Sequence, residues 1–234
     1  MKSGIEFDGI PPEGLQFLRD LAKNNNREWF SDNREVFKQQ LQEPAVALAE
    51  ALGRGLKKIA PGIQYGLNTN GSGSLFRIYR DTRFSNDKTP YKDHQDMIFW
   101  EGPGKKDYWS VFFLRIMPGA SGLGAGNHGL AKTALEKYRQ AVAGDQLGEE
   151  LEAILTGLTT AGDFQIGTEH YKRVPVGFDP AHRRAALLRF NALHVFDGSL
   201  SDAELSLPDL VENCLARFEK VAPLHHWLVK VMGG

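Results

Sequence analysis

The stretch LFRIYRDTRFSNDKTPYKDH, residues 75–94, combines charged and aromatic side chains more densely than any other segment of the chain. Its first half follows the turn-forming run Asn70-Gly71-Ser72-Gly73 and is predicted to be a β-strand. Its second half is predicted to be a loop that Pro90 ends. Because successive side chains of a strand point to opposite faces, the first half should present two different surfaces.

The two faces of this predicted strand differ in polarity. The polar face comprises Arg77, Tyr79, Asp81 and Arg83. The opposite, mostly apolar face comprises Phe76, Ile78, Arg80, Thr82 and Phe84. An apolar face is expected to meet the core, where an unpaired charge is costly, so Arg80 should have a carboxylate partner. On the polar face, two planar guanidinium groups suit phosphate and carboxylate ligands.

The loop that follows supplies further candidate ligand-binding residues, Lys88, Tyr91 and Lys92. If the ligand reacts, the arginines would stabilise developing negative charge, and Asp81 or His94 would be the general base. Arginines and aspartates on a strand also form purely structural ion-pair ladders. The residue pattern leaves both interpretations open.

The motif F-R-I-Y-R-D-x-R-F-S-x-D-K-T-P-Y-K-x-H resembles the signature of a widespread, mostly bacterial family, the domain-of-unknown-function family 2461. Asn24-Asn25-Asn26-Arg27-Glu28-Trp29-Phe30, the run Pro175-Val176-Gly177-Phe178-Asp179 with His182, and Leu200-Ser201-Asp202 extend the resemblance over essentially the whole chain. The family has no established activity. The resemblance therefore supports the importance of residues 75–94 and assigns no catalytic role.

Composition narrows the class of protein. The chain has 28 Lys and Arg against 29 Asp and Glu, whereas nucleic-acid-binding proteins usually carry a basic excess. Its single cysteine, Cys214, allows no intrachain disulfide and lies on an apolar helical stripe, which indicates a buried thiol. No apolar run is long enough to span a membrane, and residues 1–6 lack the apolar core of a signal peptide. We expect a cytoplasmic protein.

The predicted fold class is α+β, with a single domain over residues 1–234. Helices are expected in residues 1–60, the sheet core in 74–117, and helices with further strands in 130–234. Short connections favour an antiparallel or mixed sheet. The predicted strands after residue 94 are 95–100, 108–117, 164–166 and 192–196. The apolar residues on both faces of 108–117 predict helices on both of its sides.

Three further features lead to local predictions. Gly124, Gly126 and Gly129 fit the G-x-G-x-x-G pattern, but the upstream sheet is predicted to be antiparallel, which disfavours a dinucleotide site and leaves a loop that could approach a ligand. A helix is predicted to begin at Pro180, with His182, Arg183 and Arg184 in its first turn. Pro223 is predicted to separate a short last helix from the one before it.

His94 and Asp96 share a face and could supply two metal ligands, with others from His128, His170 or His182. No closed ligand set is evident, so we predict a hydrogen-bonded His–Asp pair and no metal site.

The leading hypothesis is a protein that binds an anionic, phosphate- or carboxylate-bearing ligand at this strand and loop. The sequence indicates no cofactor or oligomeric state and leaves catalysis open. One alternative is a non-catalytic protein-interaction module in which the ladder is structural. A weaker one is nucleic-acid binding, because residues 75–94 carry five cations and three acids.

Overall fold

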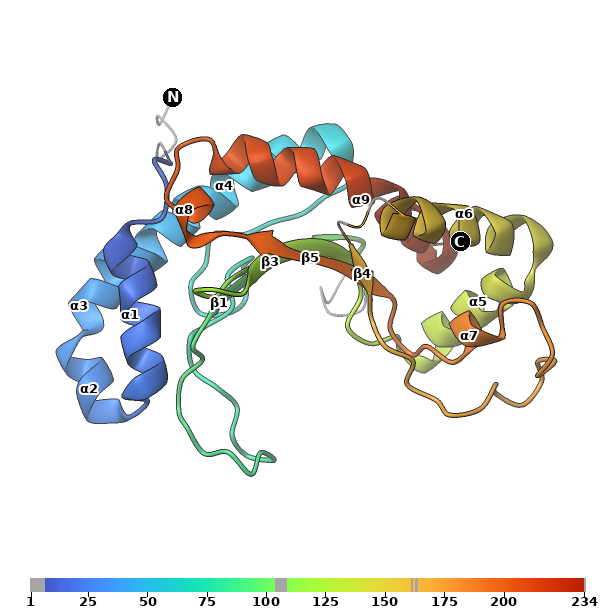
Figure 1. Cartoon of the computed structure of the whole chain (residues 1–234), viewed down its shortest axis with the longest axis horizontal. Coiled ribbons are helices and arrows are strands. Elements are labelled where there is room, and N and C mark those ends of the chain that lie inside the picture. Colours follow the sequence, from blue (N-terminus) through green and yellow to red (C-terminus); the bar gives the residue numbers. More distant parts are fainter. Residues whose placement is uncertain (1–6, 104–108, 161, 163, 234) are drawn as a thin grey trace.

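The computed structural model describes residues 7–103, 109–160, 162 and 164–233. Its centre is a five-stranded antiparallel sheet with the strand order β1-β2-β3-β5-β4 (Figure 1). The strands are β1 (Gln95–Glu101), β2 (Ser110–Ile116), β3 (Ser121–Gly126), β4 (Gln165–Ile166) and β5 (His194–Leu200). The predicted α+β class and antiparallel sheet are confirmed.

The long helices α4 (Glu43–Ile59) and α9 (Leu210–Gly233) cover one face of the sheet (Figure 1). Phe112, Leu114 and Ile116 of β2 point into this core, which also contains the buried Cys214. Val111 and Phe113 point to the opposite face and form a small separate cluster. The prediction that helices cover both faces of this strand is therefore wrong, because a small cluster of mostly aromatic side chains, and no described helix, lies on the second face.

Helix α9 is continuous through Pro223, so the predicted break there is also wrong. Proline removes one backbone hydrogen bond from a helix interior. Here Val221, Ala222 and Leu224 are all buried on either side of it. Because packing stabilises both halves against the same core, the helix tolerates the lost bond.

The N-terminal helices form a group at one end of the sheet (Figure 1). They are α1 (Pro12–Lys23), α2 (Arg27–Asp32), α3 (Arg34–Val36) and the π-helical turn η1 (Phe37–Gln42). Pro12 is the first residue of α1. The Asn26 side chain caps α2 by accepting a hydrogen bond from Trp29 N at 2.9 Å. Phe17, Phe30 and Phe37 pack together between these helices.

Helices α5 (Lys132–Ala143), α6 (Asp145–Thr160) and α7 (Ala185–Leu188) lie at the other end. The predicted helix from Pro180 is wrong, because α7 begins only at Ala185. Arg184 is just 2% exposed and donates to the Val142 and Gly144 carbonyls at 2.6 and 2.9 Å. These acceptors lie at the C-terminal end of α5, where a cation is favourable. The short α8 (Asp202–Leu205) begins with a capping box formed by Ser201 and Glu204.

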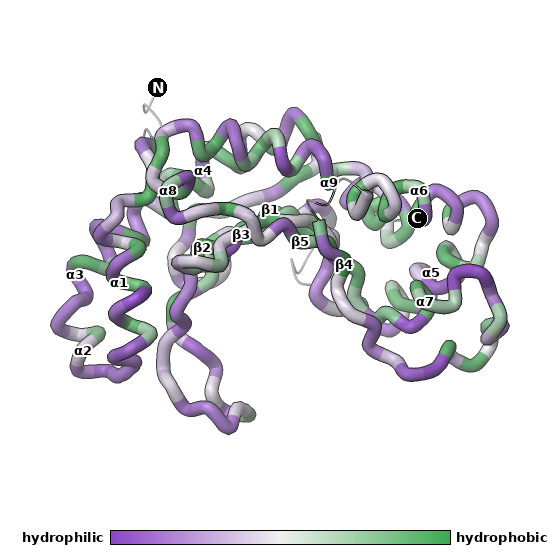
Figure 2. Tube along the Cα trace, in the orientation of Figure 1, coloured by the Kyte–Doolittle hydropathy of each residue, from purple (hydrophilic) through white to green (hydrophobic). Residues whose placement is uncertain are grey.

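Residues 76–94, called the arm below, project from the sheet and contain no regular strand (Figure 1). The predicted strand is reduced to the isolated bridges Leu75↔Met97 and Tyr79↔Tyr91. The arm pairs with itself, since Arg80 N donates to Pro90 O. No core lies beneath its outer part, where the chain is mostly hydrophilic (Figure 2) and Phe84 is 94% exposed. The alternation of side chains along the sequence could not show that this segment leaves the sheet.

The glycine-rich segment that was predicted to be a loop contains strand β3. It pairs with β2 and β5, so Gly124 and Gly126 lie within the sheet instead of before a helix. This arrangement excludes the strand–turn–helix context of a dinucleotide fingerprint.

Candidate functional site

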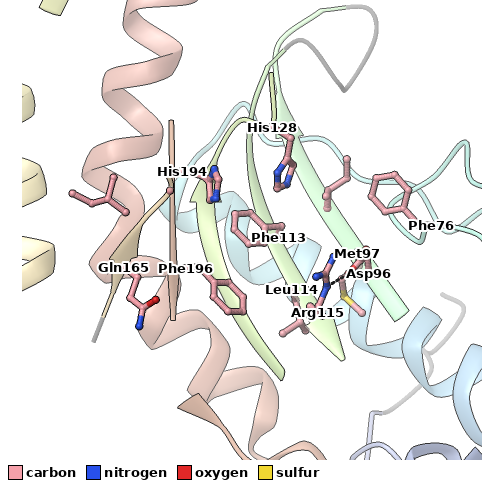
Figure 3. Close-up of a pocket in the computed structure, with 13 residues that line it drawn as sticks. Phe76, Asp96, Met97, Phe113, Leu114, Arg115, His128, Gln165, His194 and Phe196 are labelled. Atoms are coloured by element: carbon pink, nitrogen blue, oxygen red, sulfur yellow. Dashed lines mark hydrogen bonds and ion pairs between the residues drawn. The ribbon is translucent and has the colours of Figure 1, made fainter. Parts of the chain in front are cut away.

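The face of the sheet that the helices leave uncovered carries a cavity of about 500 Å³ (Figure 3). Side chains of β1, β2, β4 and β5 line it together with Phe76 of the arm and His128, which follows β3. Its lining residues are Phe76, Asp96, Met97, Ile98, Phe113, Leu114, Arg115, His128, Gln165, Ile166, Gly167, His194 and Phe196. This sheet cavity is apolar on its floor and polar at its ends.

Aromatic rings form much of the floor. Phe113 and Phe196 lie parallel, with 6.2 Å between their centroids and 5° between their planes. A Cβ atom at Gly124 would lie 2.8 Å from the Phe113 ring and would clash with the Val195 carbonyl. The glycines of β3 therefore make room for rings that reach across from the neighbouring strands.

Asp96 organises one polar end. Arg115 donates to both of its oxygens, from Nε at 2.7 Å and from Nη2 at 3.1 Å. His94 Nε2 lies 3.2 Å from Asp96 Oδ2, and His94 Nδ1 lies 2.7 Å from Asp93 Oδ1. Desolvation alone would raise the pKa of Asp96, but the bonds from His94 and Arg115 hold that pKa well below its usual range. The predicted His94–Asp96 pair is present, and Asp96 is ionised.

Lys92 adds a cation beside this group. Its ammonium lies 5.0 Å from the centre of the ring of Phe76, which lines the sheet cavity. Lys92 is half-buried, and desolvation lowers its pKa. The attraction of Asp96 opposes this shift, while repulsion from Arg115 and Arg77 adds to it. Lys92 forms no ion pair with any carboxylate in the described part of the chain, so its charge is incompletely compensated.

His128 and His194 stand together at the other polar end (Figure 3), with 5.5 Å between their ring centroids. The surrounding protein desolvates both rings and lowers the pKa of each. Both imidazoles are therefore neutral at pH 7, and each can donate one hydrogen bond and accept another.

The model of a family described as Conserved hypothetical protein (DUF2461) matches residues 13–227. The chain belongs to the DUF2461 family. No curated protein matches it.

The arm of this DUF2461 protein does not hold the predicted binding residues in one group. Lys92 and His94 contact residues that line the sheet cavity, Phe76 and Asp96, whereas Arg77 is exposed and does not line it. Four others, Tyr79, Arg80, Lys88 and Tyr91, line a separate groove between the arm and the start of α2. Asp81 and Arg83 form an exposed ion pair with each other, 2.7 Å between Oδ2 and Nη2. The expectation of a single polar face formed by Arg77, Tyr79, Asp81 and Arg83 is therefore wrong, because the backbone is not a regular strand.

Arg80 has the carboxylate partner that was predicted for it. Its guanidinium donates to Asp87 and to the hydroxyl of Thr89. Asp87 in turn accepts from Thr89 N, and hydrogen bonds from Thr89 and Arg80 lower its pKa to about 2. These bonds tie the two sides of the arm together.

Arg115, His128 and His194 are the site residues that the sequence did not reveal as a group. Arg115 gave one signal, since it interrupts the apolar alternation of its strand. His128 was considered only as a possible metal ligand, and His194 gave no signal, because 66 residues separate two positions that the β3–β5 pairing brings together. Across the described ranges, no cluster of three or more His, Cys, Asp or Glu side chains could hold a metal ion.

The helices in the described part of the chain offer no candidate membrane span, since none is both long and apolar enough.

Proposed function

We propose that the sheet cavity binds a small molecule that carries a carboxylate or phosphate group on a planar or apolar body. The observation that carries this proposal is Lys92, a partly desolvated ammonium that lies against a ring of the aromatic-lined cavity and forms no ion pair with the described carboxylates. A ligand anion beside Lys92 would replace the solvation that burial removes.

The other groups suit the same ligand. Asp96 holds Arg115 by two hydrogen bonds, so this guanidinium is fixed in orientation before a ligand arrives. The rings of Phe113 and Phe196 offer a flat surface to the ligand body. Neutral His128 and His194 would bind polar atoms at its far end. Such a combination of apolar walls and a few placed polar groups is typical of small-molecule sites.

If the bound molecule reacts, His94 is better placed than Asp81 to accept a proton. His94 contacts Asp93 and Asp96, and Asp96 lines the sheet cavity. Asp81 is bound to Arg83, whose hydrogen bonds lower the Asp81 pKa to about 2, so Asp81 is a weak base. We place this activity in the cytoplasm, where the buried free thiol of Cys214 stays reduced.

The test compares ligand affinity in Lys92→Met and Lys38→Met, with benzoate and phenyl phosphate as probes. Lys38 is an exposed lysine that lies 3.9 Å from Glu43, on a helix of the N-terminal group. Titration calorimetry should show binding to the wild type, and Lys92→Met should weaken it about tenfold or more, as expected when a charged hydrogen-bond partner is lost.

Lys38→Met should bind the probes as the wild type does, which controls for the loss of one positive charge. Both variants should keep the wild-type circular dichroism spectrum, since neither removes a core group. The proposal is wrong if neither probe binds the wild type, or if Lys92→Met binds as tightly as Lys38→Met.

A further inference from the structure

We infer that the groove between the arm and the start of α2 is a second anion site, which takes a compact phosphate-bearing ligand. This arm–helix groove has a volume of about 730 Å³. Arg27 comes from the helical side, and Arg80 and Lys88 come from the arm. No carboxylate is among the described residues that line it. A groove with three cations and no lining acid has a strong preference for anions.

Two of these cations are available to a ligand. Arg27 is exposed and forms no ion pair with a carboxylate in the described part of the chain. Lys88 donates to the Thr82 carbonyl at 2.9 Å, which orients its ammonium without neutralising it. Arg80 is occupied by Asp87 and Thr89 and therefore has a structural role in the wall.

The walls of the groove are held in place before any ligand binds. The Asn25 side chain accepts from Tyr91 N at 3.0 Å and donates to Tyr91 O at 2.9 Å, so it joins the helical group to the arm as a neighbouring strand would. The Tyr91 ring stacks on Phe30 with centroids 4.1 Å apart, and Tyr79 packs 5.2 Å from Tyr91. Because the groove is already ordered, little of the binding free energy is lost to ordering its side chains.

The groove and the sheet cavity have different side chains and therefore suit different ligands. The groove offers a guanidinium fork, an ammonium and hydroxyl groups, including that of Thr82, and its two tyrosine rings pack on each other or on Phe30. Tyr79 is half exposed and Tyr91 is buried, and their rings meet at 49° instead of lying parallel like those of Phe113 and Phe196. Donors from two sides suit several phosphate oxygens at once. We therefore assign a phosphate group without a large apolar body to this site.

Calorimetric titration with inorganic pyrophosphate at low ionic strength tests the inference. The wild type should bind, and Arg27→Gln and Lys88→Met should each weaken binding at least tenfold. Because both side chains are exposed, the variants should melt within a few degrees of the wild type.

Lys38→Met is the matched control, since it removes an exposed cation that lines neither the groove nor the sheet cavity. It should bind pyrophosphate as the wild type does. The inference is overturned if pyrophosphate does not bind the wild type, if both groove variants bind normally, or if Lys38→Met weakens binding as much as they do. The result is independent of the benzoate titration, which reports on the sheet cavity.

Discussion

At the scale of single residues, Asp96 is the side chain on which the polar end of the sheet cavity depends. It holds Arg115 in a two-bond arrangement and also contacts His94. It is ionised and largely buried, so water cannot replace the interactions that its carboxylate makes with Arg115 and His94. Its loss should therefore affect both stability and ligand binding.

We predict that Asp96→Asn lowers the free energy of unfolding by about 1–3 kcal/mol, the usual range when a charged partner is lost from a partly buried network. Asp81→Asn is the control, because Asp81 forms an exposed pair with Arg83 and its removal should leave stability unchanged. Urea denaturation measures both. Equal effects of the two substitutions would contradict the contrast between a buried network and a surface pair.

Three imidazoles determine how stability responds to mild acid. Desolvation lowers the pKa of His128, His194 and His225 in the folded protein below the ordinary 6.5. His225 is fully buried between Ser110 and Glu101, at 3.0 Å from each. Below pH 6.5 the unfolded chain therefore binds more protons than the folded one, and stability is lost as the pH falls through the folded-state pKa values.

The melting temperature should accordingly fall between pH 7.5 and pH 5.5. The exposed carboxyls of Asp81 and Asp87, with pKa values of about 2, do not titrate in this window. His225→Gln should reduce the slope, because one of the three groups no longer titrates. A melting temperature that rises toward pH 5.5 would contradict the claim that folding lowers the pKa values of these three histidines.

Contacts between residues close together in the sequence, in and beside residues 75–94, were predictable, and contacts between residues far apart in the sequence were not. The His94–Asp96 pair follows from its spacing along the sequence, and a carboxylate partner for Arg80 was expected from its place among apolar residues of the predicted strand. Arg115, His128 and His194 join the site through strand pairing, which a single sequence does not reveal.

At the scale of secondary-structure elements, the arm depends on Asn25 for its position. Two hydrogen bonds from this side chain replace the pairing that a neighbouring strand would give to Tyr91. Elsewhere hydrogen bonds link Phe76 to Gln95 and Asp96 at the base of the arm and join residues of the arm to one another, and the arm ends in exposed residues. The helical group therefore positions both the arm and the groove beside it.

Asn25→Ala should cost about 1–3 kcal/mol of stability, because it leaves two partly buried backbone groups without partners. The Tyr91 amide should also exchange its hydrogen faster, since its acceptor is gone. Hydrogen exchange followed by NMR measures this directly. An unchanged rate at Tyr91 would show that other contacts hold the arm.

Strand β3 explains why its glycines cannot be replaced. Gly124→Ala would place a Cβ against the Val195 carbonyl and the Phe113 ring, and should cost about 1–3 kcal/mol. Gly129→Ala meets open space and should change stability by less than about 0.5 kcal/mol. Thermal or urea unfolding distinguishes the two. Equal costs would contradict the strand assignment of this segment.

Element types were largely predictable where apolar periodicity is strong, as in α1, α4 and β2. Predictions were wrong where tertiary packing overrides local signals. Pro223 lies within a helix because the core holds both of its sides, and residues 76–84 leave the sheet although they alternate like a strand. Local patterns do not contain the information that decides these cases.

At the scale of the whole molecule, helices cover one face of the sheet and helical groups lie at its two ends (Figure 1). The uncovered face between them carries the sheet cavity, and the arm separates this cavity from the groove beside α2. The α+β class could be predicted from the sequence. The exposed sheet face could not, because apolar residues on both sides of β2 are equally typical of a strand that helices enclose.

The central claim is that the uncovered face of the sheet binds an anion with an apolar body. The most direct measurement is a titration with benzoate, followed by NMR of the histidine side chains. The account predicts that the ring signals of His128 and His194 shift with a common saturation curve, while those of His225 and His226 do not. It also predicts that Lys92→Met abolishes these shifts at the same benzoate concentrations. Benzoate that leaves His128 and His194 unchanged, or that shifts them equally in Lys92→Met, would contradict it.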